Sequence, residues 1–206
     1  EIGKNKQKYD YLCGAGMKDR LLNKTLRRFK TSEGLKTIHQ PKSKYKIQYP
    51  MTQTAQQLIA QAKAENWIRL DLGKCGLTNL ATQVPELFTL TDLEELVLSN
   101  EWWEWNEVKQ KWEEKKSTNI GTPNKIDQLP EALDKLRKLR VFICRGEWEE
   151  RWDIKDINPL SGLTNLTRLD LQLNRLTDVS GLSNLAALTT LYLSYNKLTD
   201  VSALSN

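Results

Sequence analysis

The chain has 206 residues, of which 39% are hydrophobic and 28% are charged, and its formal net charge is +5. It contains no run of 18 apolar residues, so a membrane-spanning helix is not expected, and its first ten residues lack the apolar stretch of a secretory signal. Three widely spaced cysteines (Cys13, Cys75 and Cys144) and a single histidine, His39, argue against a disulfide framework and against a zinc site. We therefore expect reduced thiols, no cofactor and a cytoplasmic location.

The N-terminal segment, residues 1–50, differs in charge from the rest of the chain. It holds 13 Lys and Arg against 4 Asp and Glu, a net charge of +9, whereas residues 51–206 hold 18 against 22, a net charge of −4. It shows no repeat, although Leu21, Leu22 and Leu26 would fit a short basic helix. Three interpretations stay open: a disordered tail, an arm that binds nucleic acid or an anionic surface, and upstream sequence that is not part of the native protein.

Residues 51–66 predict a short amphipathic helix. Thr52 or Thr54 would serve as its N-cap. Apolar residues recur at the i, i+3, i+4 and i+7 spacing of one helix face, namely Ala55, Leu58, Ile59 and Ala62. Such a helix would cap the first layer of the segment that follows it.

Residues 67–206 contain a repeat that is clearest near the C-terminus, where its period is 22 residues. The pattern L-x-x-L-x-L-x-x-N-x-L begins at Leu166 and again at Leu188. Phasing backwards from there predicts about five repeats, at residues 67–92, 93–138, 139–165, 166–187 and 188–206. The last of these is truncated, and its leucines have no C-terminal cap, so we expect the natural protein to continue beyond Asn206.

Each repeat position has a predicted structural role. Positions 4 and 6 point inward from a short strand, and the residue between them points outward. The fourth positions include Leu70, Leu96, Leu169 and Leu191, which we expect to form one buried column. Asparagine at position 9 turns the chain, and its side-chain amide can bond backbone groups of neighbouring repeats. Cys75 takes that position in the first repeat, so a structural role is expected for it.

This pattern resembles the leucine-rich repeat. Leu129-Pro130-Glu131-Ala132-Leu133 is similar to the L-P-x-x-L type of bacterial repeats, and Val179-Ser180-Gly181-Leu182 is similar to the internalin type. The resemblance implies an α/β solenoid with a short parallel concave sheet, a 3₁₀ or irregular convex side and an N-terminal capping helix. The capping helix followed directly by repeats also resembles the start of Roco-type signalling proteins, in which repeats precede a GTPase.

Two repeats carry inserts: residues 93–138 hold 23 extra residues and residues 139–165 hold 5. Both inserts leave the repeat just past the strand, so we expect them to lie side by side. They contain six of the seven tryptophans: Trp102, Trp103, Trp105, Trp112, Trp148 and Trp152. One interpretation is a binding lip, because Trp is enriched at interface hot spots. The other is that the rings cover the edge of the solenoid and hold the inserts down.

The sequence favours a non-enzymatic module that binds another protein on the concave face and the Trp-rich inserts. The residue types along this face are mixed in charge and partly aromatic, which suits a protein better than a polyanion. No small-molecule substrate and no membrane contact are expected, and the pattern gives no oligomeric state. The predicted contact residues are Arg69, Asp71, Glu95, Val97, Trp102, Trp103, Trp105, Ile143, Arg145, Trp148, Trp152, Arg168, Asp170, Gln172, Tyr192 and Tyr195.

Two alternative functions remain. The first is the regulatory repeat region of a larger Roco-type GTPase whose catalytic part lies beyond residue 206. The second is nucleic-acid binding through the basic tail, which predicts a steep dependence of affinity on salt.

Overall fold

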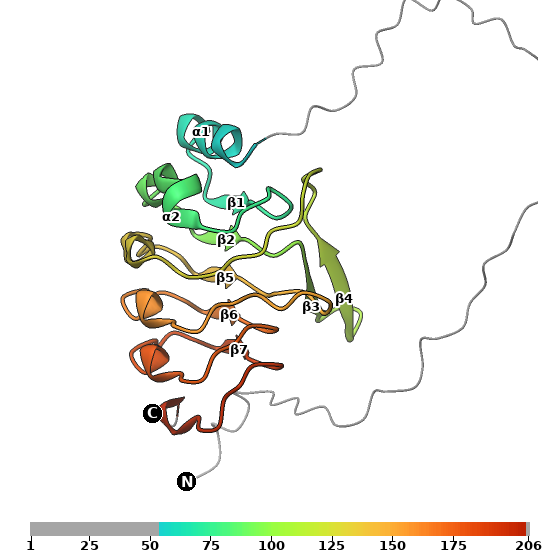
Figure 1. The fold of residues 1–206 in the computed structure, drawn as a ribbon, viewed down its shortest axis with the longest axis vertical. Helices are drawn as coiled ribbons and strands as arrows, with labels where there is room; N and C mark the ends of the chain where they lie inside the picture. Colours follow the sequence, from blue (N-terminus) through green and yellow to red (C-terminus); the bar gives the residue numbers. More distant parts are fainter. Residues whose placement is uncertain (1–53, 205–206) are drawn as a thin grey trace, which may run out of the picture. The chain divides into compact units, whose positions relative to one another are not determined.

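The computed structural model describes residues 54–204, which form a stack of short coils with one parallel sheet along its length (Figure 1). The strand order is β1-β2-β5-β6-β7. Every strand of this sheet occupies the third to fifth positions of a predicted repeat: β1 Arg69–Asp71, β2 Glu95–Val97, β5 Val141–Ile143, β6 Arg168–Asp170 and β7 Thr190–Tyr192. The predicted solenoid is confirmed.

The register of the sheet aligns the fourth residue of each repeat. Leu70 is opposite Leu96, followed by Phe142, Leu169 and Leu191, and all five are buried. No single coil could bury these side chains alone, so stacking supplies the hydrophobic stabilisation.

The N-terminal face of the stack is closed by α1, Ala55–Glu65. Thr54 is the N-cap: its side chain accepts from the backbone N–H of Gln57, and the Gln57 side chain accepts in return from the backbone N–H of Thr54. The C-cap of the helix is Asn66, whose φ of 55° is left-handed. The four apolar residues of the predicted face are buried against the first repeat, as expected for a cap.

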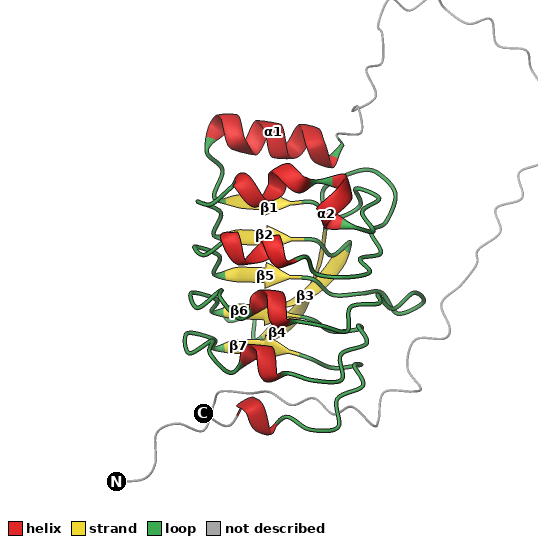
Figure 2. Cartoon of the chain, turned by 60° about the vertical axis from the view of Figure 1, so that its left-hand side comes forward, coloured by secondary structure: helices red, strands yellow, loops and turns green. Residues whose placement is uncertain are grey.

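The convex side consists of one-turn α2 (Leu80–Gln83) and short 3₁₀ turns, opposite the sheet (Figure 2). The last three turns begin in the same way. Asp156, Asp178 and Asp200 each accept a hydrogen bond from the backbone N–H two residues later. This bond recurs because the repeat places aspartate at the same position. The 3₁₀ turns are Pro85–Thr89, Glu131–Lys135, Asn158–Leu160, Ser180–Leu182 and Ser202–Leu204.

An asparagine ladder runs through the turns that follow the strands. Asn124 accepts from the N–H groups of Cys75 and Leu77, and it donates to two carbonyls of the first and second repeats. Asn196 likewise bonds the neighbouring coil, by accepting from the N–H of Leu176. The amide of Asn174 donates to the carbonyl of Cys144, but its Oδ1 is buried without a partner.

The gap in the ladder has an identifiable cause. Trp152 stands at the ninth position of the third repeat, two residues before the core residue Ile154, and its side chain is fully buried. An indole can donate but has no acceptor, so Trp152 cannot both accept and donate as the ladder amide of Asn124 does. An apolar ring thus stands in the third repeat where Asn124, Asn174 and Asn196 each bond the preceding repeat, so the ladder is interrupted between the second and third repeats.

All predictions for residues 1–50 fall outside the residues that the structure describes.

Candidate functional site

The long insert folds into a β-hairpin. Strand β3, Glu101–Asn106, pairs antiparallel with β4, Lys111–Lys116, over six residue pairs. At its base the N–H of Ser117 donates to the carbonyl of Asn100, which makes the two chain ends of the insert adjacent. The hairpin lies on the concave side of the sheet, opposite the convex turns (Figures 1 and 2).

The sheet beneath the hairpin is not the open face that the sequence suggested. Val97 and Ile143 are buried although neither belongs to the core cluster, and Arg145 and Asp170 are buried as well. The expectation that these four residues are exposed for contact is wrong. The reason is that the insert of the second repeat, which has no periodic pattern to reveal its direction, folds back over the sheet.

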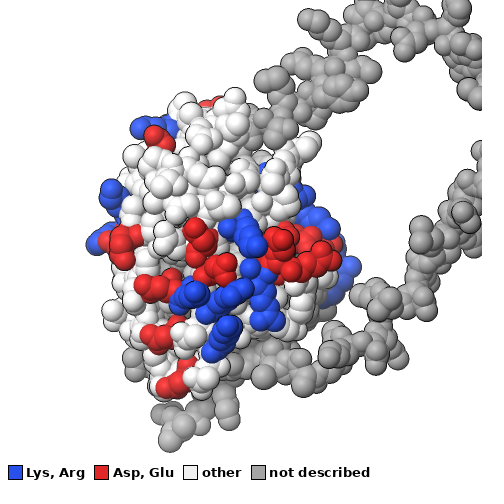
Figure 3. Space-filling view, viewed as in Figure 1, with Lys and Arg blue, Asp and Glu red and all other residues white. Residues whose placement is uncertain are grey.

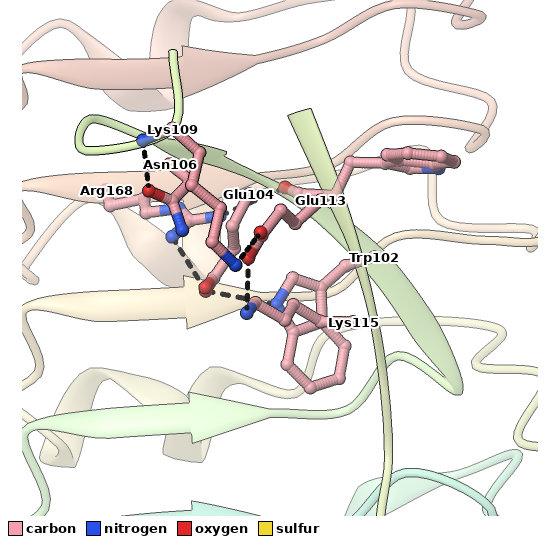
Figure 4. Close-up of polar contacts among 8 residues, drawn as sticks. Trp102, Glu104, Asn106, Lys109, Glu113, Lys115 and Arg168 are labelled. Atoms are coloured by element: carbon pink, nitrogen blue, oxygen red, sulfur yellow. Dashed lines mark hydrogen bonds and ion pairs between the residues drawn. The ribbon is translucent and has the colours of Figure 1, made fainter. Parts of the chain in front are cut away.

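Arg168 on β6 fastens the hairpin to the sheet (Figure 4). Its Nη1 donates to Oε1 of Glu104 at 3.0 Å, and its Nη2 donates to the carbonyl of Trp103 at 3.2 Å. The indole N–H of Trp102 donates to the same Glu104 carboxylate. The guanidinium also lies 5.8 Å from the ring centroid of Tyr192, which makes a cation–π contact.

Charged groups stiffen the hairpin itself. Lys109 lies 2.8 Å and Lys115 lies 3.3 Å from the two oxygens of Glu113. The hydrogen bond from Lys109 and the further bonds from Asn106 and Lys115 lower the pKa of Glu113 to about 2. The carboxylate therefore stays ionised throughout the neutral range, but such exposed pairs contribute little stability each.

The face of the hairpin opposite to Trp102 and Glu104 carries tryptophans that solvent reaches. Trp103 is 43% exposed, Trp105 is 38% exposed and Trp112 is 37% exposed. Trp105 and Trp112 are cross-strand partners with ring centroids 5.6 Å apart, and Trp112 also contacts Tyr192 edge-on at 5.7 Å. These three indoles, which we call the indole face, are held on a paired two-stranded frame.

The short insert presents a second aromatic pair. Trp148 is 60% exposed and meets Tyr195 with ring centroids 4.5 Å apart. Trp152, predicted to line the same lip, is instead in the core at the ladder position described above. The inserts are joined at their base, where the Asn100 amide donates to Glu147 at 2.6 Å.

The remaining predicted contact residues lie on the first two strands and just after β6. Arg69 and Glu95 form an ion pair at 2.8 Å on β1 and β2. Asp71 accepts from the Ser117 hydroxyl and from the Thr118 N–H, so it anchors the return of the long insert. Gln172 donates its backbone N–H to Asp170. The anchoring role of Asp71 has no signal in the repeat pattern.

Asp170 has unusual electrostatics beneath the hairpin. Burial raises its pKa to about 6, against the smaller opposing effects of the Gln172 N–H, Arg145 and Arg168. Arg145 is only 6% exposed, and its Nε and Nη1 have no hydrogen-bond partner. The buried Arg145, the partly buried Arg168 and the buried carboxyl of Asp170 thus lie close together beneath the hairpin.

Other kinds of site have no support within residues 54–204. No group of three or more His, Cys, Asp or Glu side chains there could hold a metal ion, and none of the described helices is both long and apolar enough to cross a membrane. Burial raises the pKa of the Cys75 thiol to about 11 and raises that of Cys144 well above its usual value, so neither is an activated nucleophile. Figure 3 shows basic and acidic side chains interleaved on one flank, without a field of a single sign.

Comparisons with known proteins bear on the repeat. Residues 164–206 match the family model described as leucine-rich repeats in two copies. No curated protein matches the sequence at a significant level.

Several solved structures are similar to the chain. An internalin from Listeria monocytogenes aligns with a TM-score of 0.47 and 22% identity over 71% of this chain and 40% of its own. Internalin C2 from the same species aligns with a TM-score of 0.42 and 26% identity over 70% and 69%. A Leptospira interrogans leucine-rich repeat protein aligns with a TM-score of 0.44 and 21% identity over 68% and 34%. The chain thus spans less than half the length of two of these three.

The repeat class follows from the chain's own geometry together with the family match. The strand at positions 3–5 and the aligned core column, seen in residues 164–204, extend back to the first repeat. The described part of the chain is a leucine-rich repeat solenoid with a hairpin folded over its concave sheet.

Proposed function

We propose that this chain is a non-enzymatic module that recognises another protein, and that the indole face together with the Trp148–Tyr195 pair makes the contact. The observation that carries the proposal is the exposure of four tryptophans, between 37% and 60%, on two adjacent inserts. Each indole has a large apolar area and few torsions to immobilise, which is why tryptophan dominates interface energetics.

The packing of the exposed aromatic rings supports the same conclusion. Insert tips usually carry small polar residues, whereas here the aromatic rings pack against each other and against Tyr192 and Tyr195 of the last strand region. A surface that is ordered before binding loses less conformational entropy when a partner arrives. Trp102 and Arg168 hold the long insert against the sheet, and this role is compatible with recognition by the indole face.

The test is affinity capture with the full chain, followed by a measured dissociation constant for each captured protein. The triple variant Trp103→Ala, Trp105→Ala and Trp148→Ala should lose at least thirtyfold in affinity, since a hot-spot tryptophan contributes about 2 kcal/mol or more. Ile68→Ala is the matched control, because Ile68 is also apolar and 51% exposed but precedes β1. Equal affinity of the triple variant and the control would reject the proposal.

The Roco-type alternative uses the same surface as part of a larger signalling protein. A phosphate-binding loop encoded downstream of residue 206 would support it. The nucleic-acid alternative depends on residues 1–50, and the mixed charges of the described flank in Figure 3 do not favour it.

A further inference from the structure

The space between the hairpin and the sheet holds more hydrogen-bond donors than acceptors. Arg145 is 94% buried and leaves Nε and Nη1 unpaired, and Arg168 leaves its buried Nε unpaired. A buried guanidinium that lacks acceptors is costly, because it has lost its water without replacement. An arrangement of this kind needs an explanation other than packing.

The neighbouring carboxyl groups do not satisfy these donors. Asp170 lies near enough to Arg145 and Arg168 for their charges to lower its pKa, but its Oδ1 bonds the Gln172 N–H, and no ion pair joins it to either arginine within 4.0 Å in the described residues. Glu104 bonds only Arg168 of the two, at 3.0 Å. The hairpin therefore supplies one carboxylate to a site that has donors for more.

The hairpin is attached in a way that allows it to be displaced. Its ion pair to the sheet joins side chains that remain 21% and 32% exposed, and such half-exposed pairs are weak. Two further contacts join it to the sheet: the bond from Arg168 to the Trp103 carbonyl at 3.2 Å, and the edge-on meeting of Trp112 with Tyr192 of β7. Both ends of the insert leave the solenoid at the bonded pair Asn100 and Ser117, so the hairpin can lift without altering the coils.

We propose that Arg145 and Arg168 form a docking site for the carboxylates of an acidic segment of a partner protein, and that the hairpin covers this site until the segment displaces it. A carboxylate fits better than a multiply charged phosphate, because Asp170 stays in the site as one negative charge against two arginines, and Glu104, which leaves with the hairpin, is itself a carboxylate. Its two oxygens match the planar donor pairs of a guanidinium. This inference rests on the proposed protein-binding function.

The experiment uses a shortened chain in which Glu101–Lys116 is replaced by Asn-Gly, a dipeptide that favours a two-residue turn between Asn100 and Ser117. The probe is a fluorescent pentapeptide, acetyl-Glu-Trp-Glu-Trp-Glu-amide, and its control replaces each Glu by Gln. We expect the shortened chain to bind the acidic peptide at least tenfold more tightly than the intact chain does. The Gln peptide and an Arg145→Gln variant of the shortened chain should each lose tenfold or more.

Equal binding of the two peptides, or unchanged binding by the Arg145→Gln variant, would overturn the inference. So would an equal thermal shift with inorganic phosphate, since that would indicate a general anion site. If the shortened chain does not fold, Glu104→Gln in the intact chain provides the second test. This substitution removes the ion pair to Arg168 and should raise the affinity for the acidic peptide. No increase in affinity would refute the proposal that the hairpin covers the site.

The two proposals fail separately. Substituting Trp103, Trp105 and Trp148 by Ala in the intact chain tests capture by the indole face. The peptide assay is independent of this face, because the shortened chain lacks Trp103 and Trp105. Loss of capture without any peptide binding would leave the proposed function standing and reject the covered site.

Discussion

The substitution Asn124→Ala tests the physical basis of the repeat stack. The Asn124 side chain makes four buried hydrogen bonds: it accepts from Cys75 and Leu77 at 3.0 and 2.8 Å and donates to the carbonyls of Leu72 and Leu98 at 2.7 and 2.8 Å. Alanine would leave four backbone groups without these partners. Each buried group left unpaired costs about 1–3 kcal/mol, so we expect the free energy of unfolding to fall by at least about 4 kcal/mol.

Asn174→Ala is the matched control for this prediction. Asn174 donates to three carbonyls, but those of Leu171 and Gln172 keep second partners in Asn196 and Gly146. Its Oδ1 bonds nothing, so alanine there should cost only about 1–3 kcal/mol. Urea unfolding of the full chain, followed by tryptophan fluorescence, measures both. A loss for Asn124→Ala no larger than that for Asn174→Ala would refute the reasoning.

Three further predictions follow from the described contacts. Trp152→Ala should lower the free energy of unfolding in urea by about 3–5 kcal/mol, because it empties a fully buried site. Trp148→Ala is the control and should cost under about 1 kcal/mol, because Trp148 is 60% exposed. Similar costs for the two variants would contradict the assigned burial. Asp170 has its folded pKa raised to about 6 from 3.8, so the native state binds the proton more tightly, and its contribution to stability is present below pH 4 and lost as the pH rises through 6. Asp170→Asn should therefore raise the free energy of unfolding at pH 7.5 by up to about 3 kcal/mol. It should also reduce the change in that free energy between pH 4 and pH 6, and urea unfolding curves at all three pH values would check both effects. Thr54→Ala removes the capping box of α1 and should lower the free energy of unfolding by about 1 kcal/mol. Lys63→Ala, at an exposed position of the same helix, is the control, and an equal effect of the two substitutions would show that the cap is not needed.

The stacking of the repeats could be predicted because one constraint recurs. Leu169 and Leu191 can be buried only if their strands lie side by side, and the spacing of 22 residues then places every other role in register. The same logic located the capping helix, because the first coil needs a cover and the apolar face of α1 is the nearest one.

The inserts could be predicted only in part, since they do not repeat. The hairpin had a signal that was missed: Trp103 and Trp105 alternate with Glu104, which is a period of two typical of a strand. Trp152 also had one, because phasing Ile154 in the third repeat places Trp152 at the ninth position. What no local pattern reveals is the direction in which the hairpin folds, which depends on the long-range bond between Arg168 and Glu104.

The interrupted asparagine ladder divides the solenoid into two blocks. The amides of Asn124, Asn174 and Asn196 each bond the preceding coil, but the third coil has the buried ring of Trp152 at this position and makes no such amide bond to the second. An apolar contact between two coils resists their separation less than a set of side-chain amide hydrogen bonds that must break together. Under tension along its long axis, the stack is therefore expected to fracture first between its second and third coils.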